Sequence, residues 1–305
     1  MMKSRISAFA LAIAFALSGV AGAEEAPSQP SSPAADATVQ VGMVDAPCPP
    51  QKAPSAAILE VANAAVTPGR PFVDYIKSAS PATLAALAQQ QKDQEIGKTR
   101  DWPDTCLYKP ANAALRGHKP KVAFMGDSIT QMWASADPAM FGEDIVDRGI
   151  SGQTSEQMLV RFMQDVVNLK PQVVHILAGV NDIAGNTGPN SPEDYKNMMR
   201  AMVTLARANH IAVVIGSILP CNRFPFQPKS TPAPRIAELN AWLRAFAAEN
   251  HAQFVDYYSA LAGPESEFPA KLSNDGLHPN RDGFAIMGPL AEAAITRAVH
   301  ANHHP

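Results

Sequence analysis

The chain has 305 residues, of which 46% are hydrophobic and 17% are charged, so it can bury a core for one large domain or two modest ones. Its formal net charge is −3, and no basic stretch with interleaved aromatic residues occurs in it. These two features argue against nucleic acid as a partner.

The N-terminal 23 residues have the pattern of a secretory signal peptide. Lys3 and Arg5 form a positive start, residues 6–20 are mostly apolar, and the small residues at 21–23 form a cleavage site before Glu24. The alternative is a membrane anchor, but the apolar run is short for a span of about 20 residues. We therefore predict cleavage before Glu24, a secreted or periplasmic product, and no stable insertion in a membrane.

Two further segments precede the main domain. Residues 24–50 are rich in Pro, Ser and Ala and lack aromatic residues, which is typical of a disordered linker. Residues 51–120 are predicted to form a mostly helical extension, with one helix starting at Ser80 as the cap and Pro81 as the first helical residue. We expect this extension to pack on the main domain and not to be catalytic.

The chain has three cysteines, Cys48, Cys106 and Cys221. Export to an oxidising compartment favours a disulfide. A bridge between Cys48 and Cys106 would tie down the extension, because both residues precede the main domain. Spacing alone does not determine the pairing, so this bridge is a hypothesis.

Strands and helices alternate in residues 121–299, and residues 300–305 form a short C-terminal tail. The expected strands, rich in Val and Ile, are 122–125, 145–147, 173–177, 212–217 and 253–256. Helical patterns follow at 130–136, 155–168, 192–209, 234–249 and 282–299. This alternation predicts a flavodoxin-like α/β fold in three layers, α/β/α, with a five-stranded parallel sheet in the order 2-1-3-4-5.

The predicted strand order brings three distinctive turns together. Strand 1 ends at Gly126-Asp127-Ser128, strand 2 leads to Gly152, and strand 3 leads to Gly179-Val180-Asn181-Asp182. Ligands of such sheets bind outside the carboxyl ends of the strands, where the strand order reverses. We therefore expect the active site at this edge.

Ser128 is the candidate nucleophile, because it lies between a strand and the N-terminus of a helix, where unpaired N–H groups favour negative charge. The alternative is that Ser128 only caps the helix. Acyl transfer by a serine needs a base and a group that orients the base. His278 is the candidate base and Asp275 its partner, with Gly276 allowing a tight turn between them.

Three donors are candidates for an oxyanion hole: the backbone N–H groups of Ser128 and Gly152, and the side-chain amide of Asn181. A glycine at 152 lets the backbone approach a substrate. Asp182 fits a structural turn residue better than a catalytic one. The loop at Phe224-Pro225-Phe226 either walls the crevice or is an ordinary surface loop.

In this order, the four stretches resemble the motifs of the SGNH hydrolases, also called GDSL esterases and lipases. The resemblance covers about residues 121–299, with Ile129 where many relatives have Leu. It implies Ser128 as nucleophile, His278 as base and Asp275 as its orienting partner. It also implies an oxyanion hole of Ser128, Gly152 and Asn181, and no metal or organic cofactor.

The function that the resemblance implies is a serine esterase acting on a small-molecule or glycan ester through an acyl-enzyme. Two alternatives remain: an O-acyltransferase acting on cell-envelope glycans, and a non-catalytic glycan-binding module. The turns after the first three strands hold few apolar residues beyond Met132, Trp133 and Ile183. Each buried methylene contributes only about 0.8 kcal/mol, so a shallow crevice predicts a preference for short acyl chains.

Overall fold

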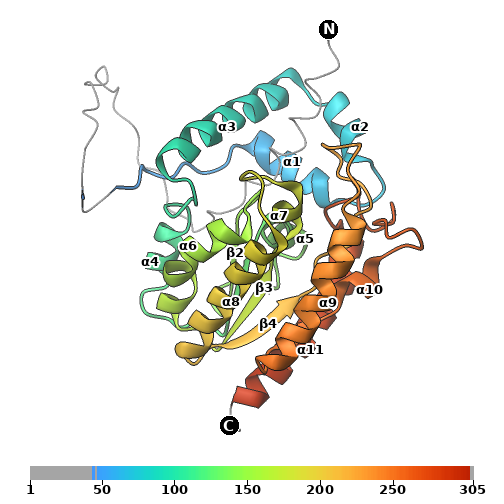
Figure 1. The fold of residues 1–305 in the computed structure, drawn as a ribbon. Coiled ribbons are helices and arrows are strands. Elements are labelled where there is room, and N and C mark those ends of the chain that lie inside the picture. Colours follow the sequence, from blue (N-terminus) through green and yellow to red (C-terminus); the bar gives the residue numbers. More distant parts are fainter. Residues whose placement is uncertain (1–42, 45–46, 303–305) are drawn as a thin grey trace.

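The computed structural model describes residues 43–44 and 47–302. The proposed signal peptide, most of the proposed linker and residues 303–305 lie outside them. The described chain forms a central sheet with helices on both sides and a group of N-terminal helices at one end (Figure 1).

The sheet has five parallel strands in the order β2-β1-β3-β4-β5, as the sequence predicts. All residues of the two central strands β1 and β3 are buried, which is typical of a parallel sheet covered on both faces. The strands are β1 Val122–Gly126, β2 Ile145–Gly149, β3 Val173–Leu177, β4 Ala212–Gly216 and β5 Gln253–Val255.

The strand order explains how the helices divide between the two faces. The chain moves from β1 to its neighbour β2 and then crosses back over β1 to β3, so the two connections run in opposite directions along the sheet. Because both crossovers are right-handed, their helices lie on opposite faces. Accordingly, α5 (Ser128–Ala136) contacts α11 (Arg281–Asn302), whereas α6 (Ser155–Asp165) contacts α8 (Pro192–Ala208). The remaining long helix of this domain is α9 (Ala233–Glu249), which packs against β5.

The structure differs from the prediction at some element ends. Residues 155–168 were expected as one helix, but α6 ends at Asp165 and a separate 3₁₀ turn covers Val167–Leu169. The backbone of Val166 leaves the helical region between them, with φ −128° and ψ −67°. Two five-residue helices were not predicted, α7 (Val180–Ala184) and α10 (Tyr257–Leu261).

The N-terminal extension is helical, as expected, and lies at the end of the sheet where α5 and α7 begin (Figure 1). Ser80 caps its longest helix, with Pro81 at the first position, as predicted. The predicted disulfide between Cys48 and Cys106 is present. The helices of the extension are α1 (Ala56–Val66), α2 (Phe72–Lys77), α3 (Pro81–Arg100) and α4 (Lys109–Ala114).

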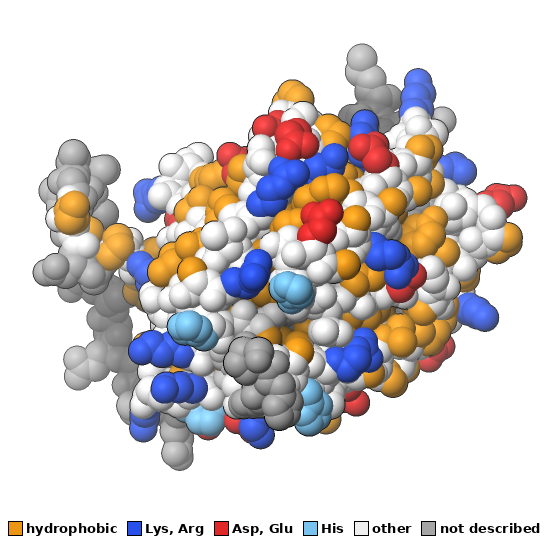
Figure 2. All heavy atoms as spheres, turned by 60° about the horizontal axis from the view of Figure 1, so that its bottom comes forward, with side chains coloured by type: hydrophobic (Ala, Val, Ile, Leu, Met, Phe, Trp, Pro, Cys, Tyr) orange, Lys and Arg blue, Asp and Glu red, His pale blue; other side chains and the backbone are white. Residues whose placement is uncertain are grey.

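Charged side chains of both signs are interspersed on the face that Figure 2 shows, the lower side of Figure 1. No single-sign field covers this face, in line with the absence of a basic stretch in the sequence. Within residues 43–44 and 47–302, no helix has both the length and the apolar character needed to cross a bilayer.

Candidate active site

Ser128 lies at the first position of α5, separated from the end of β1 by one residue, Asp127. The helix cap is its neighbour Asp127, whose carboxylate accepts a hydrogen bond from the Ile129 N–H at 2.9 Å. The alternative that Ser128 only caps the helix is therefore wrong. Ser128 has an exposed fraction of 5%, so only a small part of its surface is open to solvent.

The side chain of Ser128 begins a continuous line of three hydrogen-bonded groups. Its Oγ lies 2.9 Å from Nε2 of His278, although 150 residues separate the two in sequence. On the other side of the imidazole ring, Nδ1 lies 2.6 Å from Oδ2 of Asp275. The structure thus brings together the three residues that the sequence pattern proposed as nucleophile, base and orienting acid.

The loop that carries Asp275 and His278 is shaped by its own hydrogen bonds. The second oxygen of Asp275, Oδ1, accepts the backbone N–H groups of Leu277 and His278 at 2.9 and 2.8 Å. Gly276 has φ +80°, in the left-handed region that favours glycine, so the tight turn expected there is present. The hydrogen bonds within the turn thus hold the carboxylate against the ring.

Each partner in this pair changes the pKa of the other. Burial alone would raise the pKa of Asp275, but the charge of His278 and the hydrogen bonds from His278 and Leu277 hold it below its ordinary value. Burial alone would lower the pKa of His278, but the charge and hydrogen bond of Asp275, aided by the charge of Asp127, raise it overall. The electrostatics therefore favour the state in which Asp275 is ionised and His278 accepts a proton readily.

The candidate oxyanion donors Gly152 and Asn181 are linked through Asn186. The side-chain nitrogen of Asn186 donates to the carbonyl oxygen of Gly152 at 3.0 Å and to Oδ1 of Asn181 at 2.9 Å. Gly152 has φ +76°, whereas a Cβ built on it would meet nothing closer than 3.8 Å. Glycine is thus required there by the backbone angle and not by lack of space.

The amide nitrogen of Asn181 has two acceptors within the protein. It donates to the backbone oxygen of Gln153 at 3.0 Å and to Oδ2 of Asp127 at 3.3 Å. Burial raises the pKa of Asp127 to about 7. Since the longer of the two bonds points to the residue next to Ser128, the amide of Asn181 faces the nucleophile end of the site.

Asp182, which the sequence suggested to be structural, fixes the start of α6. Its Oδ2 accepts a hydrogen bond from the backbone N–H of Ser155 at 3.1 Å, and its Oδ1 accepts one from the Ser155 hydroxyl at 2.5 Å.

A buried arginine, Arg161, supports the same region and was not predicted from the sequence. It donates to the side chain of Gln153 at 2.6 Å and to the carbonyl oxygen of Gly126 at 3.1 Å.

The N-terminal extension also holds the loop that carries Asp275. The side chain of Asn274 donates to the backbone oxygens of Ala65 and Thr67, both at 2.8 Å, and its own backbone oxygen accepts the N–H of Phe72 at 3.0 Å. These residues lie in α1, just after it, and at the start of α2. The extension therefore does more than cover the main domain, since it anchors the residue next to Asp275.

Among the residues that the structure describes, no three histidine, cysteine, aspartate or glutamate side chains lie close enough to hold a metal ion together. The site consists of a hydroxyl, an imidazole, a carboxylate and several N–H donors. This set can carry out nucleophilic acyl transfer by proton transfer and hydrogen bonding alone.

Comparison with known proteins identifies the family. Residues 124–286, more than half of the chain, match the family model described as GDSL-like Lipase/Acylhydrolase family. The chain belongs to this family. It is an enzyme of the GDSL, or SGNH, acylhydrolase type, and the matched region contains all five candidate site residues.

Two solved structures from Bacteroides are similar to this acylhydrolase. A protein of Bacteroides fragilis, assigned as an acylhydrolase, is 40% identical with a TM-score of 0.63, and the match covers 65% of this chain and 99% of that one. A GDSL-like lipase of Bacteroides thetaiotaomicron is 39% identical with a TM-score of 0.61, covering 64% and 98%. An acetylxylan esterase of Geobacillus stearothermophilus is 27% identical over 155 residues, which are 48% of this chain and 69% of that enzyme.

Proposed function

We propose that this acylhydrolase is an exported serine esterase that cleaves short-chain carboxylic esters, in particular acetyl esters, through a covalent acyl-enzyme. The observation that carries the proposal is the unbroken line from Ser128 Oγ through His278 to Asp275, with bonds of 2.9 and 2.6 Å. This arrangement is what a serine needs to act as a nucleophile near neutral pH.

In the first half of the proposed reaction, Ser128 Oγ attacks the ester carbonyl carbon while its proton moves to Nε2 of His278. Asp275 accepts a hydrogen bond from Nδ1 and stabilises the imidazolium that forms. The tetrahedral intermediate then collapses, the bond to the alcohol oxygen breaks, and the proton on Nε2 goes to the leaving alcohol. Water attacks the acyl-Ser128 ester by the same route, which releases the acid and restores the hydroxyl.

The negative charge on the intermediate needs donors, and three groups are proposed for it: the N–H groups of Ser128 and Gly152 and the amide of Asn181. The amide nitrogen of Asn181 lies 3.3 Å from Oδ2 of Asp127 and 3.0 Å from the backbone oxygen of Gln153. We expect the hydrogen of the longer bond, to Asp127, to turn to the carbonyl oxygen of the substrate. The bond to Gln153 then stays in place and keeps the amide oriented.

Ser128 gives the direct test of this function. A fluorophosphonate probe and p-nitrophenyl acetate should both react with the wild-type enzyme, and Ser128→Ala should abolish labelling and nearly all turnover. Ser191→Ala, which changes a serine that caps α8 on the surface, should behave like wild type. Labelling of Ser128→Ala at the wild-type rate, or a wild-type enzyme inert to both reagents, would reject the proposal.

The preference for short acyl chains has its own test. In a p-nitrophenyl ester series we expect kcat/KM for acetyl and butyryl esters to exceed the values for long-chain esters. The support is the small number of apolar residues in the turns after β1, β2 and β3, and the name of the acetylxylan esterase among the relatives. A series that peaked at a chain of about 12 carbons or more, each methylene adding up to about 0.8 kcal/mol, would favour a lipid substrate instead.

Export is supported by the signal-like N-terminus and by the disulfide between Cys48 and Cys106, which is typical of oxidising compartments. We expect Glu24 to be the first residue of the exported protein. N-terminal sequencing of exported material checks this, and retention of Met1 would contradict it.

A further inference from the structure

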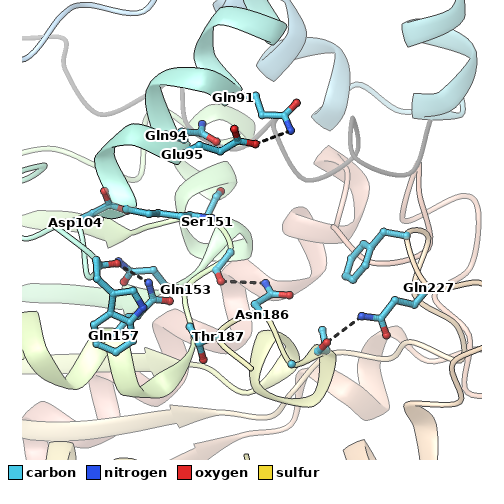
Figure 3. Close-up of a pocket in the computed structure, with 16 residues that line it drawn as sticks. Gln91, Gln94, Glu95, Asp104, Ser151, Gln153, Gln157, Asn186, Thr187 and Gln227 are labelled. Carbon is cyan, nitrogen blue, oxygen red and sulfur yellow. Dashed lines mark hydrogen bonds between the residues drawn. The ribbon is translucent and has the colours of Figure 1, made fainter. Parts of the chain in front are cut away.

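A pocket of about 430 Å³ lies between the N-terminal extension and the turn that contains Gly152. In Figure 3, Gln91, Gln94 and Glu95 come from α3 on one side, whereas Asn186, Thr187 and Gln227 come from loops on the other. Its volume is within the range of small-molecule sites, roughly 300–1,000 Å³. This pocket makes α3 part of the surroundings of the active site.

The pocket adjoins the proposed oxyanion hole directly. Gly152, one of the candidate donors, is a lining residue. Asn186, also in the lining, bonds both Gly152 and Asn181. An ester carbonyl at these donors therefore lies at the edge of the pocket, and a substituent that extends past Gly152, the acyl chain or the alcohol, enters it.

The composition of the lining decides which substituent that is. Ala184 is its one aliphatic side chain, so its apolar surface comes chiefly from two aromatic rings and from the stems of long polar side chains, and not from the aliphatic walls that line an acyl channel. The lining instead holds six side-chain amides, those of Gln91, Gln94, Gln153, Gln157, Asn186 and Gln227. Amides both donate and accept hydrogen bonds, as the hydroxyl groups of an alcohol portion require.

Some of these amides build the wall, and others have atoms left for a ligand. In Gln153 and Gln157 both the amide oxygen and the amide nitrogen are already hydrogen bonded within the protein. The nitrogen of Gln153 donates to the backbone oxygen of Pro103, and that of Gln157 donates to the backbone oxygen of Trp102, both at 2.7 Å. In contrast, the buried Nε2 of Gln94 has no hydrogen-bond partner among the described residues. A buried donor without a partner costs about 1–3 kcal/mol, so a ligand hydroxyl accepting from it would recover stability.

Two aromatic side chains and the charges of the lining restrict the chemistry of the ligand further. Trp102 is 38% exposed, and Phe226 is stacked on Phe224 at 5.4 Å between ring centroids; both Trp102 and Phe226 line the pocket. The lining contains two carboxyl groups, of Glu95 and Asp104, against the single cation of Lys98, so it does not favour an anion. The aromatic rings can pack on the C–H faces of a sugar, and the amides can bond its hydroxyl groups. Since the lining has no excess of cations, an uncharged sugar fits it best.

We propose that this pocket binds the sugar portion of an O-acylated, uncharged oligosaccharide, with α3 and Trp102 as specificity determinants that lie outside the matched family region. The proposal rests on the esterase function above and names the alcohol that this function would release. It makes Gln94 a donor to a sugar hydroxyl and Trp102 a platform for a sugar ring.

The test compares two substrates in the same variants. Trp102→Ala and Gln94→Ala should each raise KM about tenfold, or 1.4 kcal/mol, for the best substrate in a panel of O-acetylated oligosaccharides of xylose, mannose and N-acetylglucosamine. Their kcat/KM for p-nitrophenyl acetate should stay within about twofold of wild type, which also shows that they fold. Gln89→Ala is the matched control on α3, since Gln89 is exposed, is not a lining residue of the pocket and donates from its side chain to Asp93.

Failure of this proposal differs from failure of the esterase function. If wild type hydrolyses p-nitrophenyl acetate but none of the panel, or if both variants leave KM for the best oligosaccharide unchanged, the sugar pocket is wrong and the esterase stands. Equal losses on both substrates would also overturn the pocket, because they would show general damage. A wild type inactive on every ester would instead reject the esterase function itself.

Discussion

The amide nitrogen of Asn181 has two hydrogens, and in the free site both have acceptors, the backbone oxygen of Gln153 and the carboxylate of Asp127. An oxyanion donor that is already oriented loses little freedom when a substrate arrives. The same arrangement implies that substrate must compete with Asp127 for one hydrogen. The consequences for rate and for pH dependence can be tested at single residues.

Asn181→Ala should lower kcat by about 10²–10³, the usual loss for one oxyanion donor, with little change in KM. The reason is that the amide acts mainly on the charge that develops in the transition state. Steady-state kinetics with p-nitrophenyl acetate measure both constants, and Asn197→Ala, an exposed asparagine of α8, is the control. An increase in KM alone would remove Asn181 from the oxyanion hole.

Asp275→Asn should move the acidic limb of the kcat/KM profile to lower pH. The ordinary pKa of histidine is about 6.5, and Asp275 raises the pKa of His278, which must be neutral to act as a base. Without the carboxylate, His278 stays neutral at more acidic pH. Activity should nevertheless fall severely, by up to about 10⁴, because the amide can hold the wrong tautomer. A limb that stays in place or moves to higher pH contradicts this assignment.

The three residues of the proposed triad could be predicted because each is marked by a local pattern, Gly-Asp-Ser after an apolar strand and Asp-x-x-His in a turn. The partners of Asn181 could not, since they depend on how loops after different strands pack together. Arg161 escaped notice for a related reason. It lies within an ordinary helical pattern, and only the folded chain brings its guanidinium to Gln153 and Gly126.

Among the elements, β2 and α5 approach each other unusually closely. A Cβ placed on Gly149, the last residue of β2, would collide with the backbone nitrogen of Gln131 and lie 2.8 Å from the carbonyl oxygen of Asp127. Backbone atoms cannot move aside as a flexible side chain can. This contact sets where α5 begins and therefore where Ser128 stands.

Gly149→Ala should lower the free energy of unfolding by about 1–3 kcal/mol, the usual cost of overpacking. Gly142→Ala is the matched control, because a Cβ there meets nothing within 4 Å, and it should change stability by less than about 0.5 kcal/mol. Urea denaturation of both variants measures the difference. If Gly149→Ala and Gly142→Ala had equal free energies of unfolding, α5 would be able to shift away from β2 without loss of stability, which would contradict this prediction.

The five strands and their order were predictable from periodicity, since alternating apolar strands and long helices leave few topologies. The short helices α7 and α10 were not, because five residues complete less than two turns and show no helical period. Helix α6 ends at Asp165 because the backbone of Val166 is not helical. The sequence did not reveal this end, since the apolar pattern continues through Val167.

At the scale of the whole molecule, a disulfide closes the N-terminal region on itself, and polar contacts bind the extension to the catalytic domain. The Cys48–Cys106 bridge closes a segment with a sequence separation of 58 residues. Residues 102–105 then accept hydrogen bonds from three glutamines of the main domain, Gln153, Gln157 and Gln164. The sequence suggested the bridge but not these contacts, because a glutamine in a helical or loop pattern does not indicate which backbone oxygen its side chain will bond.

Removal of the bridge in Cys48→Ser/Cys106→Ser should lower the free energy of unfolding by about 2–4 kcal/mol, since the unfolded chain gains freedom. Denaturation without reductant compares the variant with wild type. Added reductant should destabilise wild type and leave the double variant unchanged. A wild type indifferent to reductant, or peptide mapping that finds both thiols free, would contradict the bridge.

The bonds from Asn274 to Ala65 and Thr67 join residues 209 and 207 positions apart, and those from Arg281 to Thr67 and Asn63 span 214 and 218. A ribosome makes the N-terminal partners first, so α1 can meet α5 long before the loop of Asp275 and His278 exists. Contacts this distant in sequence form late in folding. The order of synthesis therefore delays the triad until nearly the whole chain is complete, and a nascent chain that stops before Asn274 carries the serine without its base.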